Sequence, residues 1–179
     1  MNVWTLRRIW ILGLTITFVG IHPAAQGADS SIGTWVLNIP KSTFNPGPPP
    51  QSESRTYVMV HQETKLTTRG TEPLRQIRIN QEIQVTSTGV DGDGKPTTRE
   101  WTIGYDGKDR AMTGDPDADM VSLKRLDVFT TEFSQKNAGR VVITGTQAIS
   151  KDGTVMTITI RGINAKGQTI NDVLVFDKQ

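Results

Sequence analysis

The sequence has no cysteine and very little histidine. None of its 179 residues is Cys, and two are His. The lack of cysteine excludes a disulfide framework, a thiol nucleophile and a thiolate metal site. His22 lies in an N-terminal targeting pattern, which leaves His61 alone and excludes a zinc site built from histidines. We interpret His61 as an ordinary strand residue and expect no enzyme, no catalytic residue, no metal and no cofactor.

Excess charge of either sign is also lacking once the N-terminal segment is set apart. The whole chain has 20 Lys+Arg and 18 Asp+Glu. Arg7 and Arg8 are the only charged residues before Asp29, so the remainder has 20 − 2 = 18 basic residues against 18 acidic ones. No basic stripe accompanies the aromatic residues. The composition therefore gives no support for nucleic acid or an anionic membrane as a partner.

Residues 1–28 have the pattern of a signal peptide. Arg7 and Arg8 precede an uncharged apolar run from Ile9 to Ile21, which is shorter than the ~20 residues that a membrane-spanning helix needs. Ala25-Gln26-Gly27 fits the small-x-small pattern of a cleavage site. The alternative is an uncleaved N-terminal anchor. We expect a periplasmic or secreted protein with no stable membrane anchor after signal removal, and one domain over residues 29–179.

From Ser31 onward the chain lacks a helical pattern. Apolar residues alternate with polar ones or form short β-branched runs, and Gly, Asp, Asn and Pro separate them. This pattern predicts an all-β fold of about 8–10 antiparallel strands, either an up-and-down barrel or a sandwich. Residues 62–73 are polar and are predicted to be mostly loop. The expected strands cover 33–38, 55–61, 82–90, 97–105, 120–126, 128–134, 139–149, 154–162 and 168–177, with shorter ones at 65–68, 74–80 and 108–113.

Several aspartates gather in expected turns. Asp91 and Asp93 lie in Asp91-Gly-Asp-Gly-Lys-Pro96, which is the strongest hairpin-turn pattern in the chain. Asp115, Asp117 and Asp119 alternate in a second loop. Oxygen ligands suit calcium, but the loop lacks the downstream glycine and glutamate of a full calcium-binding loop. We favour a solvated turn and keep calcium as the alternative.

One strand face combines apolar area with a cation and a phenol. Arg99, Trp101, Ile103 and Tyr105 alternate along the strand expected at 97–105. If this face lines a barrel, it could bind an acyl chain and an anionic head group. In the alternative, Trp101 and Ile103 are packed core and Arg99 extends to the rim. Arg125 and Arg161 are further candidates for inward-facing cations.

The first expected strand resembles a known signature. Gly33-Thr34-Trp35 is similar to the Gly-x-Trp motif of the lipocalin and fatty-acid-binding superfamily. The resemblance implies that Trp35 plugs the closed end of the barrel and that a basic residue from the last strand, here Lys178, covers it. The helical lid of the fatty-acid binders has no counterpart, because Pro46–Pro50 follows the first strand.

The chain also resembles a group of uncharacterised exported bacterial proteins with lipocalin-like (calycin) barrels. No activity follows from this second resemblance. The matching stretches are Gly33–Asn38, Lys41–Pro48, Asp91–Pro96, Tyr105–Lys108, Gly114–Asp119, Val121–Arg125 and Ser150–Gly153.

Our leading hypothesis is non-catalytic binding of a small apolar or amphipathic, lipid-like ligand inside the barrel. The alternative is an envelope protein-interaction or structural module whose barrel is filled by its own side chains. The first hypothesis predicts a cavity in the barrel, and the second predicts a solid interior with an open strand edge or an apolar surface patch. The sequence leaves the oligomeric state open.

Overall fold

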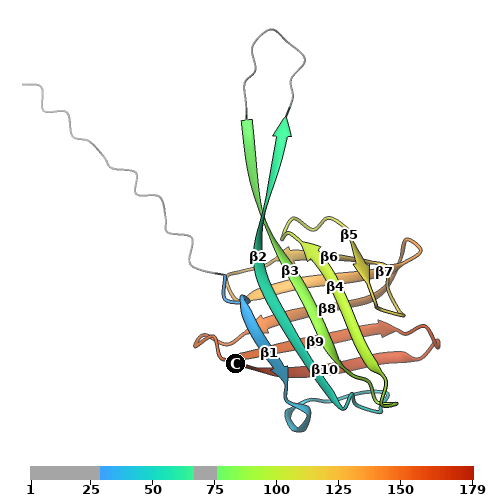
Figure 1. Cartoon of the computed structure of the whole chain (residues 1–179). Helices are drawn as coiled ribbons and strands as arrows, with labels where there is room; N and C mark the ends of the chain where they lie inside the picture. Colours follow the sequence, from blue (N-terminus) through green and yellow to red (C-terminus); the bar gives the residue numbers. More distant parts are fainter. Residues whose placement is uncertain (1–28, 67–75) are drawn as a thin grey trace, which may run out of the picture.

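The strands form one closed antiparallel barrel (Figure 1). The computed structural model describes residues 29–66 and 76–179, with the side chains of 62–66 and 76–80 left out. The signal peptide expected at 1–28 lies outside these residues. The strands are β1 (Gly33–Leu37), β2 (Ser52–Leu66), β3 (Gln76–Val90), β4 (Pro96–Ile103), β5 (Arg110–Thr113), β6 (Met120–Arg125), β7 (Thr130–Asn137), β8 (Arg140–Ile149), β9 (Val155–Ile163) and β10 (Thr169–Lys178).

Each strand pairs with its neighbours in the chain, and β1 closes the circle by pairing with β10. The all-β prediction and the up-and-down barrel are confirmed, and closure decides against the sandwich. The sole helix in the described part of the chain is a single 3₁₀ turn, η1 (Ile39–Lys41), which has Pro40 in its first turn and Asn38 as its cap. No helix among residues 29–66 and 76–179 is long and apolar enough to span a membrane.

The largest difference from prediction is the length of β2 and β3. Residues 62–64, expected as loop, and residues 65–66, expected to begin a separate short strand, continue β2. The separate strands expected at 74–80 and 82–90 form one strand from Gln76. Beyond Tyr57 and Ile83 the described parts of β2 and β3 pair only with each other. The two form an arm that projects from the barrel (Figure 1). Residues 62–66 (Gln-Glu-Thr-Lys-Leu) are mostly polar, so their sequence lacks the apolar alternation that indicates a strand.

The barrel core is densest near the ends of the chain. Trp35, Met156 and Phe176 have 0% exposed area and belong to the larger apolar cluster. A smaller cluster includes Ile103, Met112, Val121 and Leu123. We call the end at Trp35 and Lys178 the closed end. We call the opposite end, with the β3–β4, β7–β8 and β9–β10 turns, the mouth.

Candidate functional site

The inner wall of β2, β3 and β4 is arranged in layers. Arg55, Ser87 and Arg99 are register partners across these three strands and form one row. The next row toward the closed end contains Tyr57 and Trp101. Because alternate residues of a strand point to the same face, the charged row and the aromatic row line the same interior. We call the row of Arg55, Ser87 and Arg99, together with Glu53 and Asp115, the charged layer.

Glu53 and Arg55 form the tighter of two ion pairs in the charged layer. Arg55 Nε donates to Glu53 Oε1 at 2.6 Å, and Ser87 Oγ donates to the same oxygen at 2.8 Å. Burial opposes the ionisation of Glu53, but the charges of Arg55 and Arg99 and these hydrogen bonds outweigh it and lower its pKa. Arg55 also lies over the Phe176 ring, 5.0 Å from its centre. Glu53 is therefore a buried carboxylate held in its charged form.

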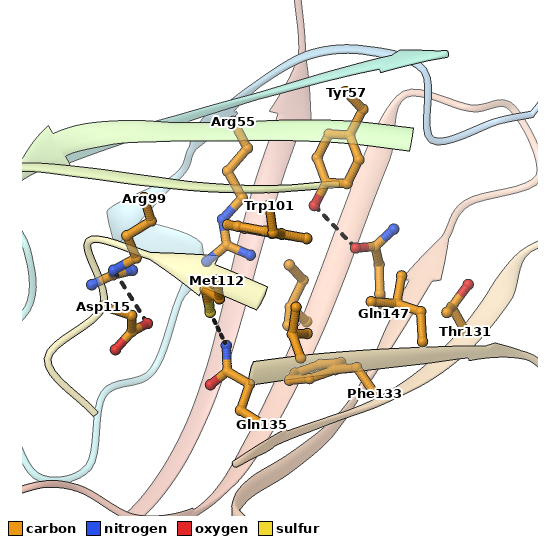
Figure 2. A pocket seen from close by; sticks show the side chains of 13 residues that line it. Arg55, Tyr57, Arg99, Trp101, Met112, Asp115, Thr131, Phe133, Gln135 and Gln147 are labelled. Atoms are coloured by element: carbon orange, nitrogen blue, oxygen red, sulfur yellow. Dashed lines mark hydrogen bonds and ion pairs between the residues drawn. The ribbon is translucent and has the colours of Figure 1, made fainter. Parts of the chain in front are cut away.

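Arg99 and Asp115 form the looser pair. Arg99 Nε lies 3.4 Å from Asp115 Oδ2, and their side chains are 29% and 9% exposed. The geometry does not make a hydrogen bond, so Arg99 Nε is a buried donor without a partner among the described residues. Figure 2 shows both arginine side chains reaching into the interior, with Asp115 beside Arg99. Arg99 therefore has a counter-charge but unused hydrogen-bonding capacity.

The charged layer separates two cavities in the barrel. The outer one, at the mouth, has a volume of about 270 Å³. The inner one has a volume of about 60 Å³ and is lined by Tyr57, Trp101 and Gln147, where the Tyr57 hydroxyl donates to Gln147 Oε1 at 3.1 Å. Side chains that line both cavities are Arg55, Arg99, Asp115, Phe133 and Gln135.

The outer cavity has two chemically different walls. Its charged wall contains Glu53, Arg55, Arg99 and Asp115, with further aspartates at the rim: Asp91, Asp117 and Asp172. Its other wall is apolar and comes from η1–β2 and from β7 to β10. The apolar residues are Phe44, Phe133, Ile143, Ile160, Ile170 and Leu174. A cavity with these two walls matches an amphipathic molecule.

The proline-rich segment borders the mouth. Pro46, Pro48 and Pro50 line the outer cavity. The segment packs on the β3–β4 turn so closely that a Cβ atom on Gly92 would lie 2.6 Å from Pro48 Cγ. Asn45 fixes its start, because the Asn45 amide donates to Asp172 Oδ1 at 2.7 Å. The segment that follows the first strand thus forms part of the cavity wall.

The comparisons with known proteins identify no relative. No family model, no curated protein and no solved structure matches the chain. The evidence for the fold and for the charged layer therefore comes from the sequence and structure of this chain alone.

The four residues of the predicted ligand-binding face lie at different depths. Arg99 and Trp101 line the cavities. Ile103 is 1% exposed and belongs to the apolar core. Tyr105 lies beyond the end of β4, toward the closed end. The strand crosses the barrel from mouth to closed end, so only its first half borders the cavities.

Tyr105 belongs to a polar cluster at the closed end. Ser31 Oγ donates to Asp29 Oδ1 at 2.6 Å, which leaves the Tyr105 hydroxyl to donate to Ser31 Oγ at 3.2 Å. The Arg125 guanidinium pairs with Asp29 and stacks on the Tyr105 ring, 3.7 Å from its centre. Burial raises the pKa of Tyr105 to about 12. The cluster ties the first described residues to the barrel.

Trp35 and Lys178 lie together at the closed end. Trp35 is fully buried, and its indole nitrogen donates to the Ser31 carbonyl at 2.8 Å. The Lys178 ammonium lies 4.9 Å from the centre of the Trp35 ring. A Cβ atom on Gly33 would lie 2.9 Å from Lys178 Cε, so glycine leaves room for the lysine stem. Both residues therefore occupy the end of the barrel opposite the outer cavity.

The aspartates weighed as calcium ligands have separate partners. Asp115 pairs with Arg99, Asp117 Oδ1 accepts from the Ala165 amide at 2.7 Å, and Asp119 Oδ2 accepts from the Ala138 amide at 3.1 Å. Asp91 Oδ1 accepts from amides of its own turn. Among the described residues, no group of three or more carboxylate or histidine side chains is placed to hold a metal ion.

Three charged residues of the charged layer were not predicted as site residues from the sequence. Glu53 and Arg55 share the inner face with Tyr57, so extending the alternation of β2 toward its start would have found them. Asp115 lies in a loop, and no sequence pattern relates it to Arg99. Arg161, considered as an inward cation, is exposed, because Ile160 beside it faces the cavity and alternation turns Arg161 outward.

Proposed function

We propose that this protein binds a small amphipathic molecule, without catalysis, in the outer cavity of the barrel. The observation that carries the proposal is a cavity of about 270 Å³ with one apolar wall and one charged wall. Ile143, Ile160 and Ile170 offer contact to a hydrocarbon body, and Arg99 offers hydrogen bonds to a polar head. Toward the closed end the inner cavity offers only about 60 Å³, which limits the ligand to a short molecule.

The partners of the cavity carboxylates favour binding over catalysis. Glu53 is paired with Arg55, and Asp115 is paired with Arg99. Asp172 accepts a hydrogen bond from the Asn45 amide, and burial raises its pKa. A general base must be free to reach a proton of the substrate, whereas Glu53 and Asp115 are each held beside an arginine. Charges fixed in this way are suited to holding a ligand in one orientation.

We further propose that the barrel is lipocalin-like and belongs to an exported protein. The Gly-x-Trp strand supports the first part, since Trp35 is buried at the closed end beneath Lys178. The charge, apolar run and small residues of 1–28 support a signal peptide and a periplasmic or secreted protein. Asp29, which directly follows that segment in the sequence, accepts hydrogen bonds from Ser31 in the closed-end cluster, and this agrees with a domain that starts at residue 29.

A blocked cavity tests the binding proposal. Ile160 lines the apolar wall, and an Ile160→Trp variant would fill much of the outer cavity. The matched control is Ile163→Trp on the same strand, where the native side chain is 56% exposed. Purified protein would be titrated with an environment-sensitive fluorescent fatty-amide probe. We expect saturable binding to the natural chain and the control, and a loss of at least about tenfold in affinity for Ile160→Trp.

Equal probe binding by both variants, or none by the natural chain, would count against a ligand in this cavity. The second result would favour the alternative, an interaction module that acts through its surface. One observation supports that alternative: the described parts of β2 and β3 beyond Tyr57 and Ile83 leave both outer edges of the arm open. An open edge can accept a strand from another chain.

A further inference from the structure

We propose that the outer cavity selects a ligand whose head group is uncharged and accepts hydrogen bonds, such as an amide, and that it discriminates against a carboxylate. This inference rests on the proposed function and specifies the chemistry of the ligand. A cation at the bottom of a barrel cavity invites the opposite expectation, an acid whose carboxylate pairs with Arg99. The contacts of the charged layer argue against that expectation.

The first argument is that the positive charge of the layer is already balanced. Glu53 lies 2.6 Å from Arg55 Nε, and Asp115 lies 3.4 Å from Arg99 Nε. A carboxylate that reached Arg99 would share this cation with Asp115 and would face Glu53 as well. Burying a third negative charge beside two arginines leaves one charge without a partner, which is costly in a partly desolvated site.

The second argument is the charge of the whole cavity lining. Five carboxylate residues line the outer cavity, against two arginines. Those at the rim are not paired with the arginines: Asp117 and Asp172 accept hydrogen bonds from backbone amides. An anion would cross this acidic rim before it reached Arg99. A cationic head group that passed the rim would meet the guanidinium groups of Arg55 and Arg99.

The third argument is that the layer has hydrogen-bonding capacity left over. Arg99 makes no hydrogen bond to another described residue, although Asp115 balances its charge. Gln135 reaches only the sulfur of Met112, at 3.6 Å, and also lines the cavity. These donors can be satisfied by a neutral oxygen such as an amide carbonyl. The volume of the cavity, about 270 Å³, is close to the lower end of the range for ligand pockets, which fits a short amphipathic molecule.

The test compares octanamide with octanoate, which share a hydrocarbon chain and differ in head-group charge. Isothermal titration calorimetry at neutral pH and low salt would measure both affinities for the folded chain. We expect octanamide to bind about tenfold more tightly or better. Octanoate binding equal to or tighter than octanamide would overturn the inference and leave the proposed function standing. Failure of both to bind would overturn the proposed function and the inference with it.

The Asp115→Asn variant identifies the residue responsible. Removing this negative charge frees Arg99 for a carboxylate, so we expect octanoate affinity to rise about tenfold while octanamide affinity changes less than about twofold. Asp93→Asn is the matched control, because it makes the same charge change in an exposed turn residue that does not line the cavity. An unchanged ratio of the two affinities in Asp115→Asn, or the same change in Asp93→Asn, would contradict the role of Asp115.

Discussion

The Lys178 ammonium lies 4.9 Å from the centre of the Trp35 ring, and the two residues are register partners in the β1–β10 pair that closes the barrel. Trp35 has no exposed area. The ring therefore fills the closed end while the lysine stem covers it from outside. The burial of the ring and the contact with the cation make separate contributions to stability, and two substitutions can separate them.

Trp35→Ala should lower the free energy of unfolding by about 3–5 kcal/mol, because it leaves a cavity in the densest part of the core. Lys178→Met keeps most of the apolar stem and removes the charge, so its cost should be about 1 kcal/mol or less. Chemical denaturation would measure both. Lys166→Met, in the exposed β9–β10 turn, is the control for lost positive charge. A larger loss for Lys178→Met than for Trp35→Ala would mean that the ion, not the ring, seals the barrel.

The barrel could be predicted from the sequence because its strands follow simple rules. The turns at Asp91–Pro96, Lys151–Gly153 and Asn164–Gly167 join strands because each contains a glycine with positive φ (Gly94, Gly153 and Gly167). Asp91 and Asn164 side chains also accept hydrogen bonds from amides of their own turns. Alternation identified Trp101 as inward-facing. These signals are local, and each is contained within a few residues.

The arm and the charged layer depend on relations that are not local. Residues 62–66 are strand because they pair with 76–80, and their polar sequence gives no alternation from which this could be predicted. Arg99 was considered either as the partner of a ligand anion or as a cation at the rim, and the structure places Asp115, sixteen positions later in the chain, beside it. Alternation shows that a side chain faces inward, but it does not show which side chain from the opposite loop it meets.

Glu53→Gln should destabilise the protein strongly. The substitution leaves the Arg55 guanidinium buried without its charge partner, and Ser87 loses its charged acceptor. Breaking a buried pair from one side typically costs about 3–5 kcal/mol. Glu100→Gln, on the exposed face of β4, is the matched control and should cost less than about 0.5 kcal/mol. Equal unfolding midpoints for the two variants in urea would show that the Glu53–Arg55 pair is dispensable.

The stability of the barrel should decrease at alkaline pH because of Tyr105. Burial raises its pKa from 10.0 to about 12, so the folded state holds the phenolic proton more tightly than the unfolded state does. The stability that this provides is complete below pH 10 and is lost as pH rises toward 12. The shift corresponds to about 2–3 kcal/mol.

An absorbance titration isolates this phenol. The chain has two tyrosines, so Tyr57→Phe leaves Tyr105 as the only one. The tyrosinate absorbance of that variant should appear with a midpoint clearly above 10, together with or before unfolding. Tyr105→Phe should lose less stability between pH 10 and 12 than the natural chain. A midpoint near 10 in the folded Tyr57→Phe variant would contradict the burial of the phenol.

Gly145 should not tolerate a side chain. It is the register partner of Phe133, and a Cβ atom there would lie 2.5 Å from Phe133 Cζ and 2.1 Å from the Thr159 carbonyl oxygen. Gly145→Ala should therefore lower the free energy of unfolding by about 1–3 kcal/mol through overpacking. It should also push the Phe133 ring toward the two cavities that it lines, and so weaken binding of any ligand there.

Gly104→Ala is the matched control for this prediction. A Cβ atom on Gly104 would have its nearest neighbours at 3.9 Å, which is ordinary contact, so the variant should unfold within about 0.5 kcal/mol of the natural chain. Thermal denaturation would rank the two variants, and probe titration would show whether the cavity is affected. If Gly145→Ala were as stable as Gly104→Ala, the Phe133 ring and the β8–β9 backbone would have to move aside without lowering the free energy of unfolding. The close packing of Phe133 over Gly145 would then not be what shapes the inner end of the outer cavity.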